Sequence, residues 1–345
     1  MSSHAIAHPR PCPCPRHRRN ELVIFIIALA IVLAALAERA TAQNKVYWTE
    51  AGQIEARIRR ANLDGTSVQT LLFDPVGSGT GNAQLSFPTS IQLDRQNQQM
   101  FWVDFGLDRI SRASFTGAGV QTVFQAASTA SLRASTLDVP NNRLYYSNFG
   151  NDTISRVNFD GTGNTTILTL PSASIPLGLS LDAAAGHIYF TDNGANMVRR
   201  VNLDGTGLVD LVTTGLDNPV NVQLDPINGK MYWVDFGNSS VSNSGRIERA
   251  NLDGSNRQTL ISNLPLPEDI ALDVLAGQMY WTDGIADQIL RANLDGTNVQ
   301  VAVSGNGIDF PFSLALDVAV PEPTGAMIAL LSGALIVRRR RRLVR

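Results

Sequence analysis

The chain has 345 residues, of which 44% are hydrophobic and 17% charged, and its formal net charge is −2. The charge is uneven, because segments 1–42 and 320–345 hold eleven basic and only three acidic residues. Residues 43–319 therefore carry 17 basic and 27 acidic residues, a net charge of −10. A domain of this charge repels phosphate backbones and anionic lipid, so we expect no nucleic-acid partner.

The first 42 residues have the pattern of a secretory signal peptide. A basic segment precedes the apolar run Leu22–Leu36, and an Ala-Thr-Ala motif follows it, so we expect cleavage between Ala42 and Gln43. An uncleaved membrane anchor is the alternative, although this run of 15 residues is shorter than the roughly 20 that a spanning helix needs. Cys12 and Cys14 lie in this leader, so the exported protein would contain no disulfide.

From residue 45 onward, one pattern recurs six times at steps of 43 to 54 residues. Each copy contains short apolar runs that alternate with polar residues and are bounded by Gly, Asp or Asn, which indicates antiparallel strands. A large aromatic residue marks the second strand of every copy: Trp48, Trp102, Tyr146, Phe190, Trp233 and Trp281. Six four-strand units at this period predict an all-β fold, namely a six-bladed β-propeller of four-stranded antiparallel blades.

The ends of the repeat region predict how the propeller closes. The region opens on an aromatic second strand, Lys45–Thr49, and ends on a first strand, Pro311–Asp317. We therefore expect the C-terminal strand to complete the first blade, which removes the open sheet edges that favour aggregation.

The aromatic strands resemble YWTD repeats, also called low-density lipoprotein receptor class B repeats. The six runs are Tyr47-Trp48-Thr49-Glu50, Phe101-Trp102-Val103-Asp104, Tyr145-Tyr146-Ser147-Asn148, Tyr189-Phe190-Thr191-Asp192, Tyr232-Trp233-Val234-Asp235 and Tyr280-Trp281-Thr282-Asp283. The resemblance covers residues 45–317 and implies that these motifs build a six-bladed scaffold whose ligand varies between members. Glu50 and Asn148 replace the final Asp, so we expect their blades to differ locally.

The other recurring polar residues have structural explanations. Asp-Gly pairs such as Asp64-Gly65 are expected to form hairpin turns, because Gly adopts the positive φ that the turn needs. They lack the additional carboxylates of a calcium loop. We predict that the recurring arginines pair with the aspartates after the aromatic residues and hold strands or blades together; these arginines are Arg60, Arg112, Arg156, Arg200, Arg249 and Arg291.

Residues 43–319 offer little for catalysis. His187 is the one histidine in that segment, and other copies have Lys230 and Gln278 at its hairpin position. Without a cysteine or a second histidine, nucleophile–histidine systems and Cys/His zinc sites are excluded. We expect no enzyme, no metal and no cofactor. The enzymatic alternative is a calcium-dependent lactonase-like or hydrolase-like propeller with a carboxylate site at its central channel.

The loops of such a propeller lie on two faces. The turn face carries the short turns between the first and second and between the third and fourth strands. The loop face carries the remaining loops, including the irregular segments Phe73–Phe87 and Phe236–Gly245, and variable loops on a rigid scaffold commonly carry function. Candidate binding residues there are Phe105, Asp108, Phe149, Asn151, Asp152, Asn193, Phe236 and Asn238. Aromatic and amide groups suit a protein or polysaccharide ligand, or else serve only as scaffold and solvated loop.

The C-terminal segment resembles the PEP-CTERM sorting signal of Gram-negative bacteria that have exosortase. Val320-Pro321-Glu322-Pro323 precedes the apolar run Gly325–Val337, and Arg338 to Arg342 follow. This is the order of a recognition motif, a short membrane segment and cations retained inside. The resemblance implies transient inner-membrane association, processing by exosortase, and a final location at the cell surface or outside the cell. A plain tail anchor is the alternative.

The sequence thus predicts three parts: a signal peptide (1–42), a propeller (43–319) and a sorting signal (320–345). The expected function is that of an exported, monomeric binding module for a protein or an extracellular polysaccharide. A structural component of the extracellular matrix is a further alternative.

Overall fold

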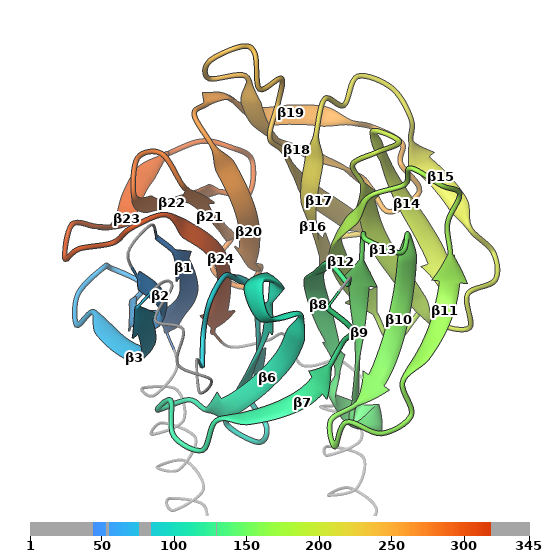
Figure 1. Cartoon of the computed structure of the whole chain (residues 1–345). Coiled ribbons are helices and arrows are strands. Elements are labelled where there is room, and N and C mark those ends of the chain that lie inside the picture. The colour runs from blue at the N-terminus through green and yellow to red at the C-terminus, as the bar shows by residue number, and fades with distance from the viewer. Residues whose placement is uncertain (1–43, 53–54, 76–83, 129, 319–345) are drawn as a thin grey trace, which may run out of the picture. The chain divides into compact units, whose positions relative to one another are not determined.

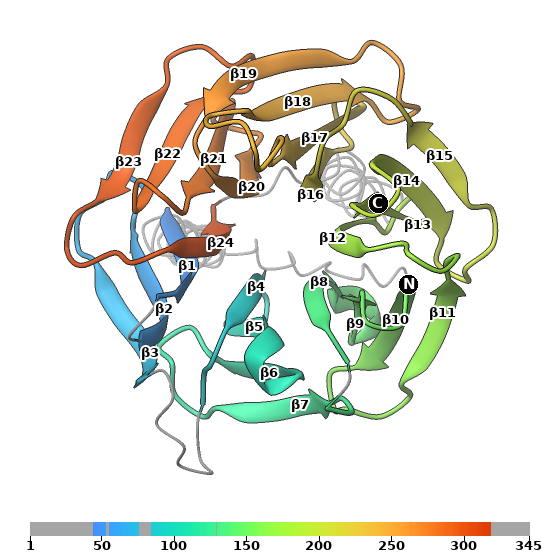
Figure 2. The ribbon, with the colours of Figure 1, turned by 45° about the horizontal axis from the view of Figure 1, so that its top comes forward.

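A computed structural model describes residues 44–52, 55–75, 84–128 and 130–318. These residues form six four-stranded antiparallel sheets (Figure 1), which are arranged as blades around a common axis (Figure 2). The predicted six-bladed propeller is therefore confirmed. The predicted signal peptide and sorting signal lie outside the described residues. Within the described ranges, no helix is long and apolar enough to cross a membrane.

Every blade runs outward from the axis in the order first, second, third and fourth strand. From blade 1 to blade 6, the first strands are β24 (Pro311–Asp317), β4 (Pro88–Asp94), β8 (Leu132–Asp138), β12 (Pro176–Asp182), β16 (Pro219–Asp225) and β20 (Pro267–Asp273), and the other strands are given in the same order. The second strands are β1 (Lys45–Ala51), β5 (Gln99–Asp104), β9 (Arg143–Asn148), β13 (His187–Asp192), β17 (Lys230–Asp235) and β21 (Gln278–Asp283).

The outer half of each blade consists of two further strands. The third strands are β2 (Glu55–Asn62), β6 (Arg109–Ser114), β10 (Thr153–Asn158), β14 (Met197–Asn202), β18 (Gly245–Asn251) and β22 (Gln288–Asn293). The fourth strands are β3 (Gln69–Pro75), β7 (Gln121–Gln125), β11 (Thr165–Thr169), β15 (Val209–Val212), β19 (Gln258–Leu264) and β23 (Gln300–Ser304). The structure also has two short 3-10 helices within its described part, η1 (Phe105–Leu107) and η2 (Val139–Asn141).

The C-terminal strand closes the ring as predicted. Strand β24 pairs antiparallel with β1, so that Lys45 lies opposite Asp317 and Trp48 lies opposite Leu314. The amide of Asn44 extends this pairing, because it donates to the Asp317 carbonyl over 2.6 Å. One predicted boundary is wrong: β3 continues to Pro75, so Phe73 lies in a strand and not in the following loop.

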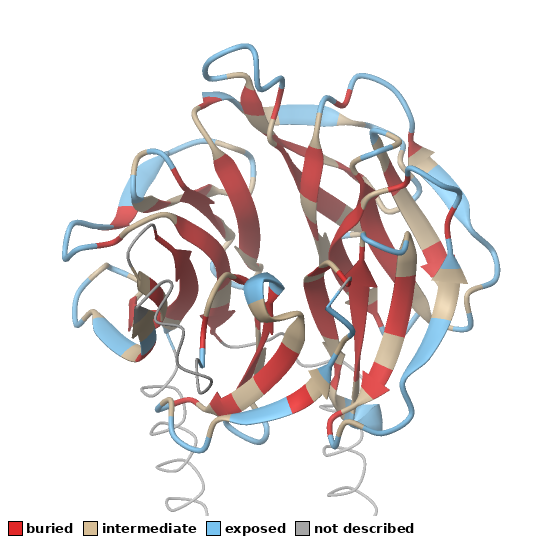
Figure 3. Cartoon of the chain, in the orientation of Figure 1, coloured by how far each residue is buried: buried red, intermediate tan, exposed pale blue. Residues whose placement is uncertain are grey.

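The hydrophobic core lies between blades. Each residue at the Trp position shares a buried cluster with residues of the preceding blade: Trp48 packs with Tyr280 and Ile289, and Trp102 packs with Ile58. Burial of one such side chain contributes about 2–3 kcal/mol. The first and second strands are buried, whereas the fourth strands are largely exposed (Figure 3). The aromatic residues of the repeat are therefore the contacts that join neighbouring blades.

In three blades, the third residue of the repeat joins neighbouring blades through its hydroxyl. Thr191 accepts from the amide of Gly178 over 2.9 Å and donates to the Val220 carbonyl of the next blade over 3.2 Å. Ser147 and Thr282 make the same two kinds of bond. The pairing of β12 with β13 shifts register between Pro176 and Leu179. The amide of Gly178 therefore loses its backbone partner in the sheet, and the hydroxyl of Thr191 replaces that partner.

The Asp-Gly turns on the turn face also pack closely against the preceding blade. In the blade 4 turn, Asp204 accepts from the amide and the hydroxyl of Thr206 over 3.0 and 2.6 Å, and Gly205 has a φ of +85°. A Cβ atom on Gly205 would overlap the carbonyl oxygen of Ile167 in blade 3. The equivalent glycines contact the preceding blade in the same way: Gly65, Gly117, Gly161, Gly254 and Gly296.

The prediction for the recurring arginines needs a correction. Four of them bind backbone carbonyls of the next blade or glutamines of the fourth strand, and not the aspartates of the repeat: Arg60, Arg112, Arg249 and Arg291. Arg60 donates to the Phe115 carbonyl over 3.0 Å, and Arg249 donates to the Leu294 carbonyl over 3.1 Å. Two of the aspartates pair with other arginines: Asp192 contacts Arg199 over 2.8 Å, and Asp235 contacts Arg246 over 2.7 Å.

Candidate functional site at the channel mouth

Buried carboxylates fix the loops that form the loop face. In blade 2, Asp104 is fully buried and accepts from the amides of Ser86, Phe87 and Leu107 over 2.8, 3.0 and 3.1 Å. The amide of Phe105 donates to the Phe87 carbonyl over 2.9 Å, so the inter-blade loop and the loop after the second strand are held side by side. Burial raises the pKa of Asp104, while the amide donors oppose this effect.

Five aromatic rings form a continuous row at the mouth of the central channel. We call Phe149, Phe105, Phe87, Phe312 and Phe310 the phenylalanine row. The first two stack with centroids 5.8 Å apart and planes at 15°, and the others meet edge-on or tilted at 5.5 to 6.2 Å. Phe105 is 37% exposed. Four of the rings lie in loops, whereas Phe312 is buried in β24, so the row joins loops of neighbouring blades to the inner strand of blade 1.

The second residues of the first strands point to the axis and differ in every blade, and one of them is Phe312 of the row. They are Thr89, Arg133, Leu177, Val220, Glu268 and Phe312. Most of them line a space of about 20 Å³, together with the residues that follow them in the strands. A space of this size holds about one water molecule. This ring therefore forms the floor of the mouth.

Two of the six floor residues are charged, and they carry opposite charges: Arg133 and Glu268. The guanidinium of Arg133 lies 4.2 Å from the centroid of the Phe312 ring and 3.6 Å from the carboxylate of Glu268. Burial raises the pKa of Glu268 to about 7, although Arg133 opposes this shift. Burial also lowers the pKa of Arg133. The pair thus connects blades 3 and 6 across the axis and joins the phenylalanine row through Phe312.

Asp269 provides a second connection across the floor. Its carboxylate accepts from the Ser313 hydroxyl over 2.6 Å, from the amides of Leu314 and Ile270 over 2.9 and 2.7 Å, and from the side chain of Asn221. Burial raises its pKa to about 6, and these donors limit the increase. Among the described residues, no group of three His, Cys, Asp or Glu side chains could hold a metal ion.

Several predicted binding residues lie at the mouth. Phe105 and Phe149 stack on each other, while Phe149 and Phe236 both pack against the cluster that contains Val220. The side-chain amide of Asn193 lies 3.4 Å from the oxygen of Asn218, in the next inter-blade loop. These four side chains therefore lie along the mouth in blades 2 to 5.

The other predicted residues lie in turns farther along the loops. Asp108 and Asp152 have φ values of 47° and 53°, and their carbonyls accept from amides that follow the fourth strands. Asn151 is exposed. Asn238 accepts from the Ser240 amide over 2.9 Å within its own loop. Asp108, Asp152 and Asn238 thus stabilise loop conformation, and these three residues are not grouped with the phenylalanine row.

Sequence reasoning missed the floor of the mouth and three of the five rings of the row. Arg133, Glu268, Asp269, Phe87, Phe310 and Phe312 were not singled out. A usable signal was present, because the second and third residues of the first strands vary among six copies that all end in Leu-Asp. On a repeating scaffold, a position that does not repeat marks a candidate site.

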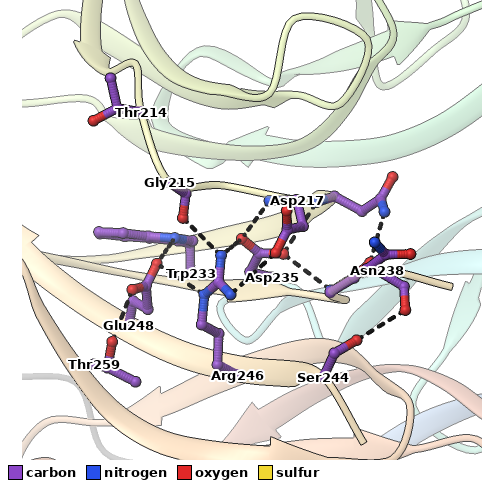
Figure 4. Close-up of polar contacts among 12 residues, drawn as sticks. Thr214, Gly215, Asp217, Trp233, Asp235, Asn238, Ser244, Arg246, Glu248 and Thr259 are labelled. Carbon is purple, nitrogen blue, oxygen red and sulfur yellow. Dashed lines mark hydrogen bonds and ion pairs between the residues drawn. The ribbon is translucent and has the colours of Figure 1, made fainter. Parts of the chain in front are cut away.

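The long loop of blade 5 is anchored by ion pairs (Figure 4). Arg246 donates to Asp235 over 2.7 Å, to Asp217 over 3.3 Å and to the Gly215 carbonyl over 2.7 Å. The side chain of Asn218 donates to the Gly237 carbonyl over 2.6 Å. The loop thus begins and ends on fixed residues, as a preformed binding surface requires.

Comparison with solved structures shows the same fold in proteins of different activity. A chain in a crystal structure of a nidogen/laminin complex has a TM-score of 0.66 and 19% identity, over 80% of this chain and 99% of that chain. Selenomethionine-substituted virginiamycin B lyase from Staphylococcus aureus has a TM-score of 0.52 and 17% identity, over 67% and 74%. A streptogramin B lyase has a TM-score of 0.52 and 16% identity, over 79% and 87%. Such identities establish the fold alone.

No curated protein matches the sequence. The family model of the low-density lipoprotein receptor repeat class B matches residues 229–274 and 277–318, which form most of blades 5 and 6 and the strand that closes blade 1. Residues 229–274 and 277–318 therefore match low-density lipoprotein receptor class B, or YWTD, repeats, and they form part of a six-bladed β-propeller.

Proposed function

We propose that this protein is an exported binding module that recognises a protein partner through the channel mouth on the loop face. The phenylalanine row carries this proposal. Aromatic side chains at the centre of a surface are typical contributors to protein–protein affinity, because they bury much area and lose little rotamer entropy. A similar propeller in a nidogen/laminin complex supports a protein partner.

The mouth is preorganised for such a partner. Asp104 holds the loops that carry Phe87 and Phe105, and the Arg133–Glu268 pair lies beneath Phe312. A surface that is already ordered avoids part of the entropy cost of association. The partner would cover the exposed rings and place a polar or charged group over the floor. A polysaccharide is the alternative ligand for the same surface.

The location of the protein is proposed from its two terminal segments. The leader 1–42 supports export, and the resemblance of 320–345 to an exosortase-processed signal supports a location at the cell surface or outside the cell. We propose no catalytic role for His187. It begins β13 on the turn face, at the opposite end of that strand from the mouth.

The test is site-specific photo-crosslinking in cells that produce the full-length chain. A photoreactive amino acid replaces Phe105 in one version and Ile227 in the other. Ile227 is 65% exposed in a turn on the turn face, so it controls for non-specific apolar contact. We expect one protein to crosslink at position 105 and not at position 227, and its yield to fall when Phe149 is changed to Ala. Equal labelling from both positions would overturn the proposal, and labelling of glycan alone would favour the polysaccharide alternative.

A further inference from the structure

A second concave surface lies at the edge of the loop face, where the last loop of blade 6 meets blade 1. We call it the blade 1 cleft. It encloses about 400 Å³ and is lined by Glu55, Arg57, Arg59, Thr70, Phe73, Asn306 and Gly307. This volume lies within the range of small-molecule sites, roughly 300–1,000 Å³. The lining residues belong to β2, β3 and the loop before β24, so the cleft is separate from the channel.

The floor of the cleft is a rigid ion-pair network. Glu50 is fully buried and accepts from the indole of Trp48 over 2.7 Å and from Arg57 and Arg59 over 3.1 Å each. Both guanidiniums also reach the inter-blade loop, since Arg57 donates to the Gly307 carbonyl over 2.8 Å. The polar groups of the cleft are therefore held in place before any ligand arrives.

The rim combines an aromatic ring with a carboxylate. Phe73 is 62% exposed, and the side chain of Glu55 is 33% exposed. Arg57 donates twice to one oxygen of Glu55, Oε2, over 2.8 and 2.6 Å, which leaves Oε1 to accept from a ligand. With Glu50 and Arg59 beneath, the cleft contains two carboxylates and two guanidiniums, so its formal charge is balanced.

Blade 5 has a cleft of the same plan without the aromatic ring. It encloses about 470 Å³ between Arg246, Glu248, Arg257 and the loop at Thr214 and Gly215. Trp233 donates to Glu248 over 3.1 Å, as Trp48 donates to Glu50.

The strand pairing identifies the residue that replaces the ring. Leu72 pairs with Ile58 in blade 1, and Ile261 pairs with Ile247 in blade 5, so Phe73 corresponds to Ser262. Ser262 is exposed. The scaffold therefore does not require an aromatic residue at this position.

We propose that the blade 1 cleft binds a neutral hexose unit of a glycan. A pyranose ring has a face of C–H groups that can pack on Phe73, and its hydroxyls can donate to Glu55 and accept from Arg57. The balanced charge of the cleft and the net charge of −10 of residues 43–319 disfavour polyanions. This site does not depend on the proposed partner surface at the mouth.

The test uses the intact protein, purified from producing cells, with maltohexaose, cellohexaose and a mannan hexasaccharide as probes. Saturation-transfer NMR identifies which of the three binds, and titration calorimetry gives its affinity. Phe73→Ser copies the blade 5 cleft and changes an exposed side chain, so the variant is expected to keep the wild-type melting temperature. We expect it to weaken binding about tenfold. Ser262→Ala, at the equivalent position of blade 5, and Phe105→Ala, at the mouth, should leave the affinity unchanged.

Three results would overturn the proposal: no saturable binding of any neutral hexasaccharide, equal affinity in Phe73→Ser, or loss of binding in Phe105→Ala. The last result would place glycan binding at the mouth. Glu55→Gln is a second variant that retains an acceptor oxygen and removes the charge. The affinity of Glu55→Gln for the hexasaccharide should decrease less than that of Phe73→Ser. If an acidic peptide bound more tightly to Glu55→Gln than to the wild type, the cleft would be an anion site and not a sugar site.

Discussion

The turn face and the loop face are built from the same repeat but differ in how strictly they repeat. On the turn face, one short turn recurs and each copy contacts the preceding blade, as Gly205 does at Ile167. On the loop face, the anchoring carboxylates recur, whereas the exposed rings, the channel floor and the edge clefts differ between blades. Repeated positions therefore maintain the ring, and positions that depart from the repeat are where recognition can develop.

The largest expected effect comes from breaking a repeated contact on the turn face. Gly205→Ala should lower the free energy of unfolding by about 3–4 kcal/mol, because the new methyl group meets the Ile167 carbonyl and Ala disfavours a positive φ. Gly186→Ala is the matched control. Gly186 also has a positive φ, but no atom lies within 4 Å of the added Cβ. It should cost about 1 kcal/mol. Urea unfolding of both variants checks the difference, and equal losses would contradict the role of the inter-blade contact.

The next effect concerns the repeated anchor beneath the loop face. Asp104→Ala should cost about 2–3 kcal/mol, because it leaves the amides of Ser86, Phe87 and Leu107 without their acceptor. Asp104→Asn retains one acceptor oxygen, as Asn148 does in blade 3 where it accepts from the Ser131 amide. We expect this variant to lose less than half as much stability. Denaturant titration gives the values, and an Asn variant as unstable as the Ala variant would show that the charge is essential.

A pH effect should arise at the channel floor, which does not repeat. Because burial raises the pKa of Glu268 to about 7 and that of Asp269 to about 6, the folded state binds more protons than the unfolded state above pH 4. The stability that these groups contribute is therefore fully present below about pH 4 and is lost as the pH rises through 6 to 7. The wild-type protein should lose unfolding free energy between pH 5 and pH 7.5. In Glu268→Gln this loss should be smaller by about 2 kcal/mol. An unchanged pH profile in this variant would assign the effect to other groups.

The smallest stability effect is expected at Phe105, the exposed ring of the phenylalanine row. Phe105→Ala should cost about 1 kcal/mol or less, because the ring is already partly exposed, yet it should reduce capture of the proposed partner more than tenfold. Leu275→Ala is the control, since Leu275 is 58% exposed in a turn on the turn face. Its stability cost should be similar and its partner capture unchanged. Thermal melting and quantitative crosslinking separate the two effects.

The fold was predictable because it depends on features that recur at a fixed period. The aromatic second strands, the bounding turn residues and the unpaired end strands predicted the six blades and the closure through β24. The partners of the recurring arginines were not predictable from spacing. Arg60 binds a carbonyl at Phe115, and a backbone carbonyl leaves no signature in the residue types.

The candidate site was predictable only in part. Phe105 and Phe149 could be selected because they follow the aromatic strand at the same offset. Phe312 could be marked only as a position that varies between copies. Its contact with Phe87 could not be predicted, because it depends on the way that first strands and inter-blade loops converge at the axis. The raised pKa values of Glu268 and Asp269 likewise follow from burial at that axis, which the pattern of a single strand does not reveal.

The pairing of β24 with β1 has a mechanical consequence. Lys45 and Asp317 are opposite each other at the turn face, so a pull that separates these two residues would open the hydrogen bonds one after another. A pull between a partner held at the mouth and a tether beyond Val318 would instead run along β24. All bonds of that pair would then share the load in shear. The closure of the ring is therefore weakest against force between its own ends and strongest against force that passes from one face to the other.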